Sequence, residues 1–203
     1  MNMGDTWGAD GPPSEAYGCV TRDLAAVTAG FAAYLDELPT RLIREYDCEL
    51  RDPTAEEIDR LPHLSSTEFD ETYAVQPRRS ECAVLVLARS RHEGGAMVRI
   101  GFGVASSALI PGCFCDACDE DSGSLIEQTN EFVHVAVEGC REYRRPYTPK
   151  PGMELHKGPW MQVGYEWRGG GSASAGPSVR GEPFSQEWQA WPHRVARSDV
   201  LSE

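Results

Sequence analysis

The chain has 203 residues, 40% of them hydrophobic, which is enough for one folded domain with a hydrophobic core. Its formal net charge of −13 argues against binding to nucleic acids or anionic membranes, because both require clustered Lys and Arg. Residues 1–14 lack the apolar stretch of a signal peptide, and the longest apolar run, residues 82–88, is too short to span a bilayer. We therefore expect a cytoplasmic protein with no membrane and no nucleic-acid partner.

The first helix is predicted to follow a disordered leader, residues 1–16, which is rich in Gly and Pro. Thr21 is a good N-cap for it, and apolar residues then recur at steps of three and four. They are Leu24, Val27, Phe31, Leu35 and Leu38. Since proline disfavours the helical conformation in the residue before it, Pro39 should kink or restart this helix.

Strand signals dominate the middle of the chain. After a segment compatible with a short helix around Ala55–Leu61, residues 72–76 read as extended. Residues 82–88 are continuously apolar, as expected of a central strand, and residues 97–104 alternate in polarity. The polar stretch 89–95 between them is predicted to be a hairpin connection.

A second helix is predicted to start at Leu125, because Ser124 and Glu127 have the spacing of a capping box. Its apolar stripe runs to Tyr143, and Arg141, Arg144 and Arg145 would complement the dipole at its end before Pro146. The alternation in Trp160–Trp167 then predicts a further strand.

The predicted domain organisation is one α+β domain, residues 17–168, with an antiparallel sheet of three to four strands. The sheet is expected to pack against the N-terminal helix and the helix that follows the cysteine loop. Residues 169–183 are interpreted as a flexible Gly/Ser-rich linker, and residues 184–203 as a C-terminal tail. Trp188 and Trp191 favour docking of that tail on the domain over contact with another protein, because aromatic rings lose most when left in water.

The candidate site is Cys113, Cys115 and Cys118, three cysteines within six residues and accompanied by acidic residues. Cys-x-Cys and Cys-x-x-Cys overlap here, so three thiolates could bind a structural metal, for which zinc fits best. The acidic residues would favour a bound cation. The fourth ligand is left open among Cys140, His134, His156, His63 and an Asp of the loop. The other cysteines, Cys19, Cys48, Cys82 and Cys140, are expected to be small buried hydrophobes.

Two other interpretations of the cysteine stretch compete with the metal site. The thiols could be redox-active, but an activated thiol needs cations nearby, and the neighbouring carboxylates act in the opposite direction. Alternatively, the stretch only shapes a turn. Pro111-Gly112 would bend the chain, the Asp residues would act as caps, and the cysteines would pack as small apolar side chains.

The chain resembles a family of uncharacterised, mainly actinobacterial proteins that carry a domain of unknown function. Three motifs, in order, carry this resemblance. They are Tyr17-Gly-Cys-Val-Thr-Arg22, Pro111-Gly-Cys-Phe-Cys-Asp-Ala-Cys-Asp-Glu120 and Trp188-Gln-Ala-Trp-Pro-His-Arg194. In the family pattern, Gly stands between the first two cysteines, where this chain has Phe114. The resemblance implies that the cysteine stretch and the tryptophan tail belong to the architecture of the domain, but it implies no activity.

The sequence contains no G-x-S-x-G, no H-E-x-x-H, no P-loop and no G-x-G-x-x-G opening a helix. We therefore favour a non-enzymatic domain with a structural, zinc-binding cysteine loop. Two alternatives remain: a small thiol-dependent enzyme or redox protein, and an acidic protein-interaction or immunity-type protein with a basic protein partner.

Overall fold

The computed structural model describes residues 11–62, 69–149, 160–176 and 181–195. Their helical elements, in chain order, are η1 (Ser14–Ala16), α2 (Leu24–Val27), α3 (Ala29–Glu45), α4 (Ala55–Asp59) and α5 (Ser122–Glu138). The strands are β1 (Cys48–Arg51), β2 (Glu71–Pro77), β3 (Leu85–His92), β4 (Gly95–Phe102), β5 (Ser106–Ile110), β6 (Arg141–Tyr147), β7 (Trp160–Trp167), β8 (Gly170–Gly176) and β9 (Phe184–Glu187).

In this part of the chain the strands form two antiparallel sheets. One has the order β1-β2-β3-β4-β5, and the other has the order β8-β7-β6-β9. The α+β class of a single domain is confirmed, but nine described strands replace the three to four that we expected. Five of them, β1, β5, β6, β8 and β9, were missed as strands because each is short, polar or rich in small residues.

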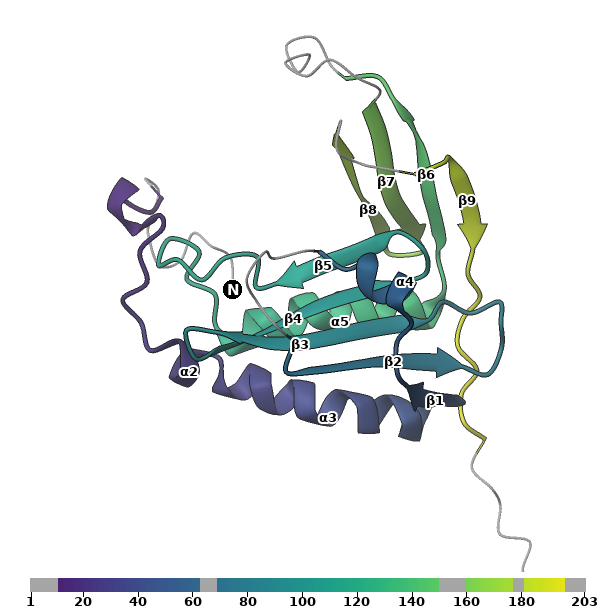
Figure 1. Cartoon of the computed structure of the whole chain (residues 1–203), viewed down its shortest axis with the longest axis horizontal. Coiled ribbons are helices and arrows are strands. Elements are labelled where there is room, and N and C mark those ends of the chain that lie inside the picture. The colour runs from purple at the N-terminus through teal and green to yellow at the C-terminus, as the bar shows by residue number, and fades with distance from the viewer. Residues whose placement is uncertain (1–10, 63–68, 150–159, 177–180, 196–203) are drawn as a thin grey trace, which may run out of the picture.

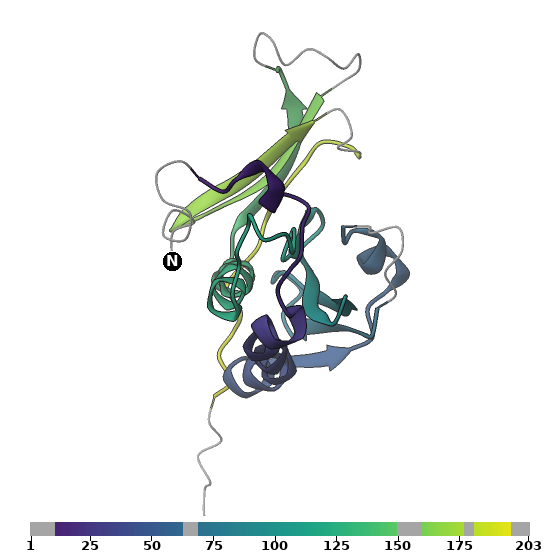
Figure 2. The same cartoon turned by 90° about the vertical axis from the view of Figure 1, so that its left-hand side faces the viewer.

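Helices α3 and α5 lie side by side on one face of the five-stranded sheet, while α4 lies on its other face (Figure 1). The main core is the layer between sheet and helices, where Phe31 and Leu35 of α3 meet Leu125 of α5 and Val98 and Ile100 of β4. The four-stranded sheet projects away from this body in both views (Figures 1 and 2).

The first helix differs from the prediction in its start and in its course. Asp23, not Thr21, caps α2, and its side chain accepts a hydrogen bond from the Ala26 N–H. The helix is interrupted at Thr28, whereas α3 runs through Pro39 without ending. The Thr28 hydroxyl donates to the Leu24 carbonyl and accepts from the Ala96 N–H of β4, so the interruption fixes the helix to the sheet.

The β3–β4 hairpin is confirmed, with a tighter turn than expected. Arg89 pairs with Val98, and His92 pairs with Gly95, so residues 89–92 belong to the strand. The turn is made by Glu93 and Gly94 alone, at φ 49° and 86°. Two successive positive φ angles are typical of the two-residue turn that matches the twist of a hairpin.

The second helix begins and ends earlier than predicted. Its capping box is formed by Asp121 and Ser124, not by Ser124 and Glu127. It ends at Gly139, whose φ is 81°, and a Cβ there would lie 2.6 Å from the carbonyl oxygen of Trp188. The tail crosses the chain at this point, so only glycine fits. Residues 141–147, which we predicted to continue the helix, form strand β6 instead.

Further differences concern the ends of the predicted domain. Of the predicted leader, residues 1–10 lie outside the described residues, whereas Ser14–Ala16 form η1. Of the predicted linker, Gly170–Gly176 form β8, paired along its length with β7. The predicted strands at residues 72–76 and Trp160–Trp167, and the short helix near Ala55, are present.

The tail docks on the domain through its tryptophans. Trp191 is buried, and its indole N–H donates to the Ala83 carbonyl at 3.0 Å. The backbone N–H of Trp191 donates to the Val137 carbonyl, and the backbone N–H of Trp188 donates to the Cys140 carbonyl. Among the described residues, no helix is long and apolar enough to cross a membrane.

Candidate metal centre

The cysteine loop, residues 111–121, connects β5 to α5 and begins at a cis peptide bond between Ile110 and Pro111. It lies beside residues 16–22, which we call the clasp segment (Figure 1). Within the loop, Asp119 has a φ of 45°, which turns the chain directly after Cys118.

The loop brings the three predicted ligand residues together. The Sγ atoms of Cys113, Cys115 and Cys118 all lie within 4.8 Å of one another, and those of Cys115 and Cys118 are 3.6 Å apart. Sulfurs bound to a tetrahedral zinc ion at about 2.3 Å lie about 3.8 Å from each other. The spacing is therefore suited to a shared ion, and it is well beyond the roughly 2.05 Å of a disulfide.

Hydrogen bonds link the cysteines of the loop. The Cys115 N–H donates to the Cys113 Sγ at 3.2 Å. The Cys115 Sγ contacts the Cys118 Sγ at 3.6 Å, and the Cys118 N–H donates to the Cys115 carbonyl at 3.0 Å. An N–H donor such as that at Cys113 stabilises the thiolate form of cysteine, which is the form that binds metals.

The protonation of the three thiols is uneven. The hydrogen bond from the Cys113 side chain, followed by that from the Gly18 N–H, lowers the pKa of Cys115 to about 6. Burial, followed by its contact with Cys115, raises the pKa of Cys118 to about 12. The loop carboxylates, which we expected to act against an activated thiol, are not among the causes of this shift, and hydrogen bonds lower the pKa of Cys115 instead.

The clasp segment is bonded to the loop along its length. The Asp116 N–H donates to the Cys19 carbonyl at 2.8 Å, and the Ala117 N–H donates to the Ala16 carbonyl at 3.1 Å. Ala16 also packs against Cys115 and Ala117 in a small apolar cluster of its own. The loop is thus held between the clasp segment and the start of α5.

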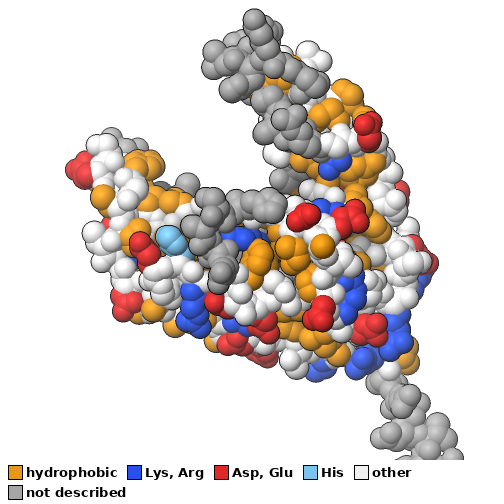
Figure 3. Space-filling model, in the orientation of Figure 1, with side chains coloured by type: hydrophobic (Ala, Val, Ile, Leu, Met, Phe, Trp, Pro, Cys, Tyr) orange, Lys and Arg blue, Asp and Glu red, His pale blue; other side chains and the backbone are white. Residues whose placement is uncertain are grey.

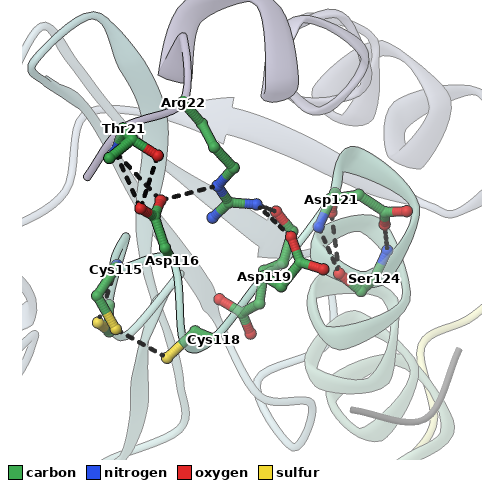
Figure 4. Close-up of polar contacts among 10 residues, drawn as sticks. Thr21, Arg22, Cys115, Asp116, Cys118, Asp119, Asp121 and Ser124 are labelled. Atoms are coloured by element: carbon green, nitrogen blue, oxygen red, sulfur yellow. Dashed lines mark hydrogen bonds and ion pairs between the residues drawn. The ribbon is translucent and has the colours of Figure 1, made fainter. Parts of the chain in front are cut away.

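The loop carboxylates are engaged with the protein. Asp116 accepts from the N–H and hydroxyl of Thr21, and its Oδ1 lies 3.6 Å from the Arg22 Nε, as Figure 4 shows. The hydrogen bonds from Thr21 lower the pKa of Asp116. Asp119 pairs with Arg22 at 3.0 Å, and Asp121 caps α5. Our expectation that these acids favour a bound cation is therefore not supported, since Arg22, Thr21 and the helix cap already occupy them.

Two of the fourth-ligand candidates lie far from the loop. His134 is twelve residues along α5 from Ser122, a distance of about 18 Å, and its ring packs edge-on against Trp167. Cys140 follows the far end of the same helix and is buried. His63 and His156 lie outside the described residues.

All seven cysteines are free thiols, and three of the four scattered ones are buried as expected. Burial raises the pKa of Cys48 to about 11 and that of Cys140 to about 12, and it also raises the pKa of Cys82. Cys19 differs from the prediction because it is exposed. It lies in the clasp segment, beside the cysteine loop.

Sequence reasoning missed the partners of the loop, namely Gly18, Thr21 and Arg22. They lie about one hundred residues earlier in the chain, and no periodicity links the two regions. The available signal was the Tyr17–Arg22 motif of the resemblance, which was not connected with the cysteines.

These observations define an α+β protein with a cluster of three thiols at the start of its second large helix. The chain belongs to a family of unknown function (DUF6226), whose sequence model matches residues 1–195. The match confirms the resemblance to a domain family without a known activity. Comparisons with curated proteins and with solved structures found no similar chain.

Proposed function

We propose that Cys113, Cys115 and Cys118 bind one structural zinc ion, which fixes the cysteine loop against the clasp segment. The observation that carries the proposal is the convergence of three sulfurs within 4.8 Å of one another, with the Cys115 N–H donating to the sulfur of Cys113. Deprotonating three thiols at this spacing would place three negative charges together. A dication at their centre would offset that repulsion.

Zinc is proposed over other metals because of the ligand chemistry. Soft thiolate ligands select zinc, Cu(I) and iron–sulfur clusters, whereas magnesium and calcium require oxygen ligands. The loop carboxylates that would suit those harder ions already hold Thr21, Arg22 and the cap of α5.

The cellular setting belongs to the same proposal. We propose a non-enzymatic domain of the cytoplasm, where a reducing environment keeps seven cysteines as thiols. Its partner would be another protein. On the face drawn in Figure 3, acidic and basic side chains are interspersed among the coloured residues, so that face offers no single acidic patch to a basic partner.

A thiol–disulfide function is the second candidate, and one observation favours it. Cys115 and Cys118 form a Cys-x-x-Cys pair with sulfurs 3.6 Å apart, and the pKa of the first is lowered to about 6. However, Cys115 is only 6% exposed, whereas attacking thiolates are normally accessible to their substrate. We therefore rank metal binding first.

Zinc titration of the reduced, metal-free protein against a chromogenic chelator tests the proposal. The wild type should bind one equivalent, and Cys115→Ser should lose tight binding, because a hydroxyl is a poor zinc ligand at neutral pH. Cys82→Ser is the matched control, since this thiol precedes β3 and bonds the Ala190 carbonyl of the tail. Equal zinc binding by wild type and Cys115→Ser would overturn the proposal.

A further inference from the structure

We propose that Cys19 supplies the fourth ligand of the metal centre, so that the site is closed by four thiolates from two distant parts of the chain. This inference rests on the proposed function of Cys113, Cys115 and Cys118. It is carried by the way in which the residues around Cys19 are bonded to the loop between Cys115 and Ala117.

The backbone of the clasp segment places Cys19 beside the sulfurs. Three residues before Cys19, the Ala16 carbonyl accepts from the Ala117 N–H at 3.1 Å. The Cys19 carbonyl accepts from the Asp116 N–H at 2.8 Å, and two residues later the Thr21 N–H donates to the Asp116 carboxylate. Cys19 is therefore fixed on both sides to the part of the loop that contains Cys115.

The side chain of Cys19 would have to turn toward the three sulfurs. Its sulfur lies outside the group of three that are within 4.8 Å of one another. The side chain is exposed, and it has one rotatable bond with three staggered positions. We infer that a bound metal recruits it through a change in this one bond.

The other nearby ligand types are less suitable. Asp116 and Asp119 are held by Thr21 and Arg22, and Glu120 accepts from the Gln128 amide at 2.7 Å. Among the described residues, His92 at the end of β3 is an imidazole beside the loop. Its ring stacks on Phe114, with centroids 5.9 Å apart, so using it as a ligand would require breaking that stack.

The fourth thiolate would decide what kind of site this is. Zinc sites with four protein ligands are structural, whereas sites with three keep a position open for water and chemistry. A ligand from Cys19 would close the site and would make the position of the clasp segment dependent on the metal. The exposure of Cys113 and Cys19 also gives the ion a path of entry.

X-ray absorption at the zinc edge of the zinc-loaded protein tests this inference, because it counts sulfur neighbours at about 2.3 Å. We expect four sulfurs in the wild type, and three sulfurs plus one oxygen or nitrogen in Cys19→Ser. His92→Ala is the matched control and should keep four sulfurs. Thermal unfolding of each variant verifies that it is folded.

The outcomes separate the inference from the proposed function. Three sulfurs plus one lighter atom in both wild type and Cys19→Ser would overturn the role of Cys19 and leave zinc binding by the loop intact. Loss of the lighter atom in His92→Ala would assign the position to that histidine and would also overturn it. A wild type that takes up no zinc would overturn both the proposed function and the inference.

Discussion

Three thiols meet around Cys115: its N–H donates to the Cys113 Sγ at 3.2 Å, and its own sulfur lies 3.6 Å from that of Cys118. The hydrogen bond from the Cys113 side chain lowers the pKa of Cys115, whereas burial raises the pKa of Cys118. A metal ion would replace the shared protons, so binding should release protons and strengthen as the pH rises.

The metal-free protein should titrate one thiolate with a pKa of about 6. A Cys113→Ser substitution should raise this pKa, because the Cys113 side chain makes the largest contribution to lowering it. Ultraviolet absorbance of the thiolate against pH measures it, with Cys115→Ser as the control that removes the transition. A first transition near the free-cysteine value of about 8.5 would contradict the geometry of the loop.

The sign of the linked stability effect follows from the same pKa. The folded-state value lies below that of the unfolded chain, so the Cys115 thiolate stabilises the metal-free fold above a pH of about 8.5. That contribution should be lost as the pH falls through about 6. Cys118, with its pKa raised to about 12, acts oppositely and should lower stability as the pH rises above about 8.5.

Glu142 is the second residue whose environment is unusual. It is fully buried, yet its carboxylate accepts from the N–H groups of Val104, Ala105 and Ser106 and from the Trp188 indole, at 2.6–3.0 Å. It therefore joins β6, the β4–β5 turn and the tail. The sequence offered no signal for this role, because residue 142 falls within the helix that was predicted to run to Tyr143.

Glu142→Gln should lower the free energy of unfolding by at least about 2 kcal/mol, because the amide NH2 would face N–H donors that then lack an acceptor. Chemical denaturation measures the change. Glu187→Gln, on the exposed surface of the neighbouring β9, is the control and should change stability little. A Glu142→Gln variant as stable as that control would show that the buried carboxylate is not needed.

Among the elements, the helices were predicted best where apolar residues recur regularly at steps of three and four. The stripe Phe31, Leu35, Leu38 and Leu42 is buried as a core face of α3. The end of the second helix was misplaced, because Cys140, just before β6, and Tyr143, within β6, continue the helical spacing by chance. The signal that ends α5 is the approach of the tail to Gly139, a contact across about fifty residues that periodicity does not contain.

The tail is an element of the fold through Trp191, which is buried in the main core. Trp191→Ala should cost about 3–5 kcal/mol, since it removes a buried aromatic ring and its hydrogen bond to Ala83. Thermal or chemical unfolding measures this, and Val195→Ala, which alters an 86% exposed side chain, is the control. Equal stability of the two variants would contradict the docking of the tail.

At the scale of the whole molecule, the cysteine loop is separate from the main core. Cys115 packs with Ala16 and Ala117 in its own small cluster, whereas α3, α5 and the five-stranded sheet share another. The composition predicted such a core, and the loop motif predicted the three sulfurs. The contact of the cysteine loop with residues 16–22 could not be predicted, and neither could the four-stranded sheet. Both depend on long-range contacts that sequence patterns do not encode.

Removing the metal should therefore loosen the site without unfolding the domain. Hydrogen exchange should quicken in residues 16–22 and 113–121 after chelation, while amides of β3 and β4 keep their protection. The same comparison in Cys115→Ser is the control, and chelator should have no effect there. A uniform loss of protection over the whole chain would contradict the separation of loop and core.

Metal analysis of protein purified without added zinc tests whether Cys113, Cys115 and Cys118 form a metal centre. We expect about one equivalent of zinc per wild-type chain and much less in Cys115→Ser. Less than about a tenth of an equivalent in the wild type, unchanged in Cys115→Ser, would contradict it.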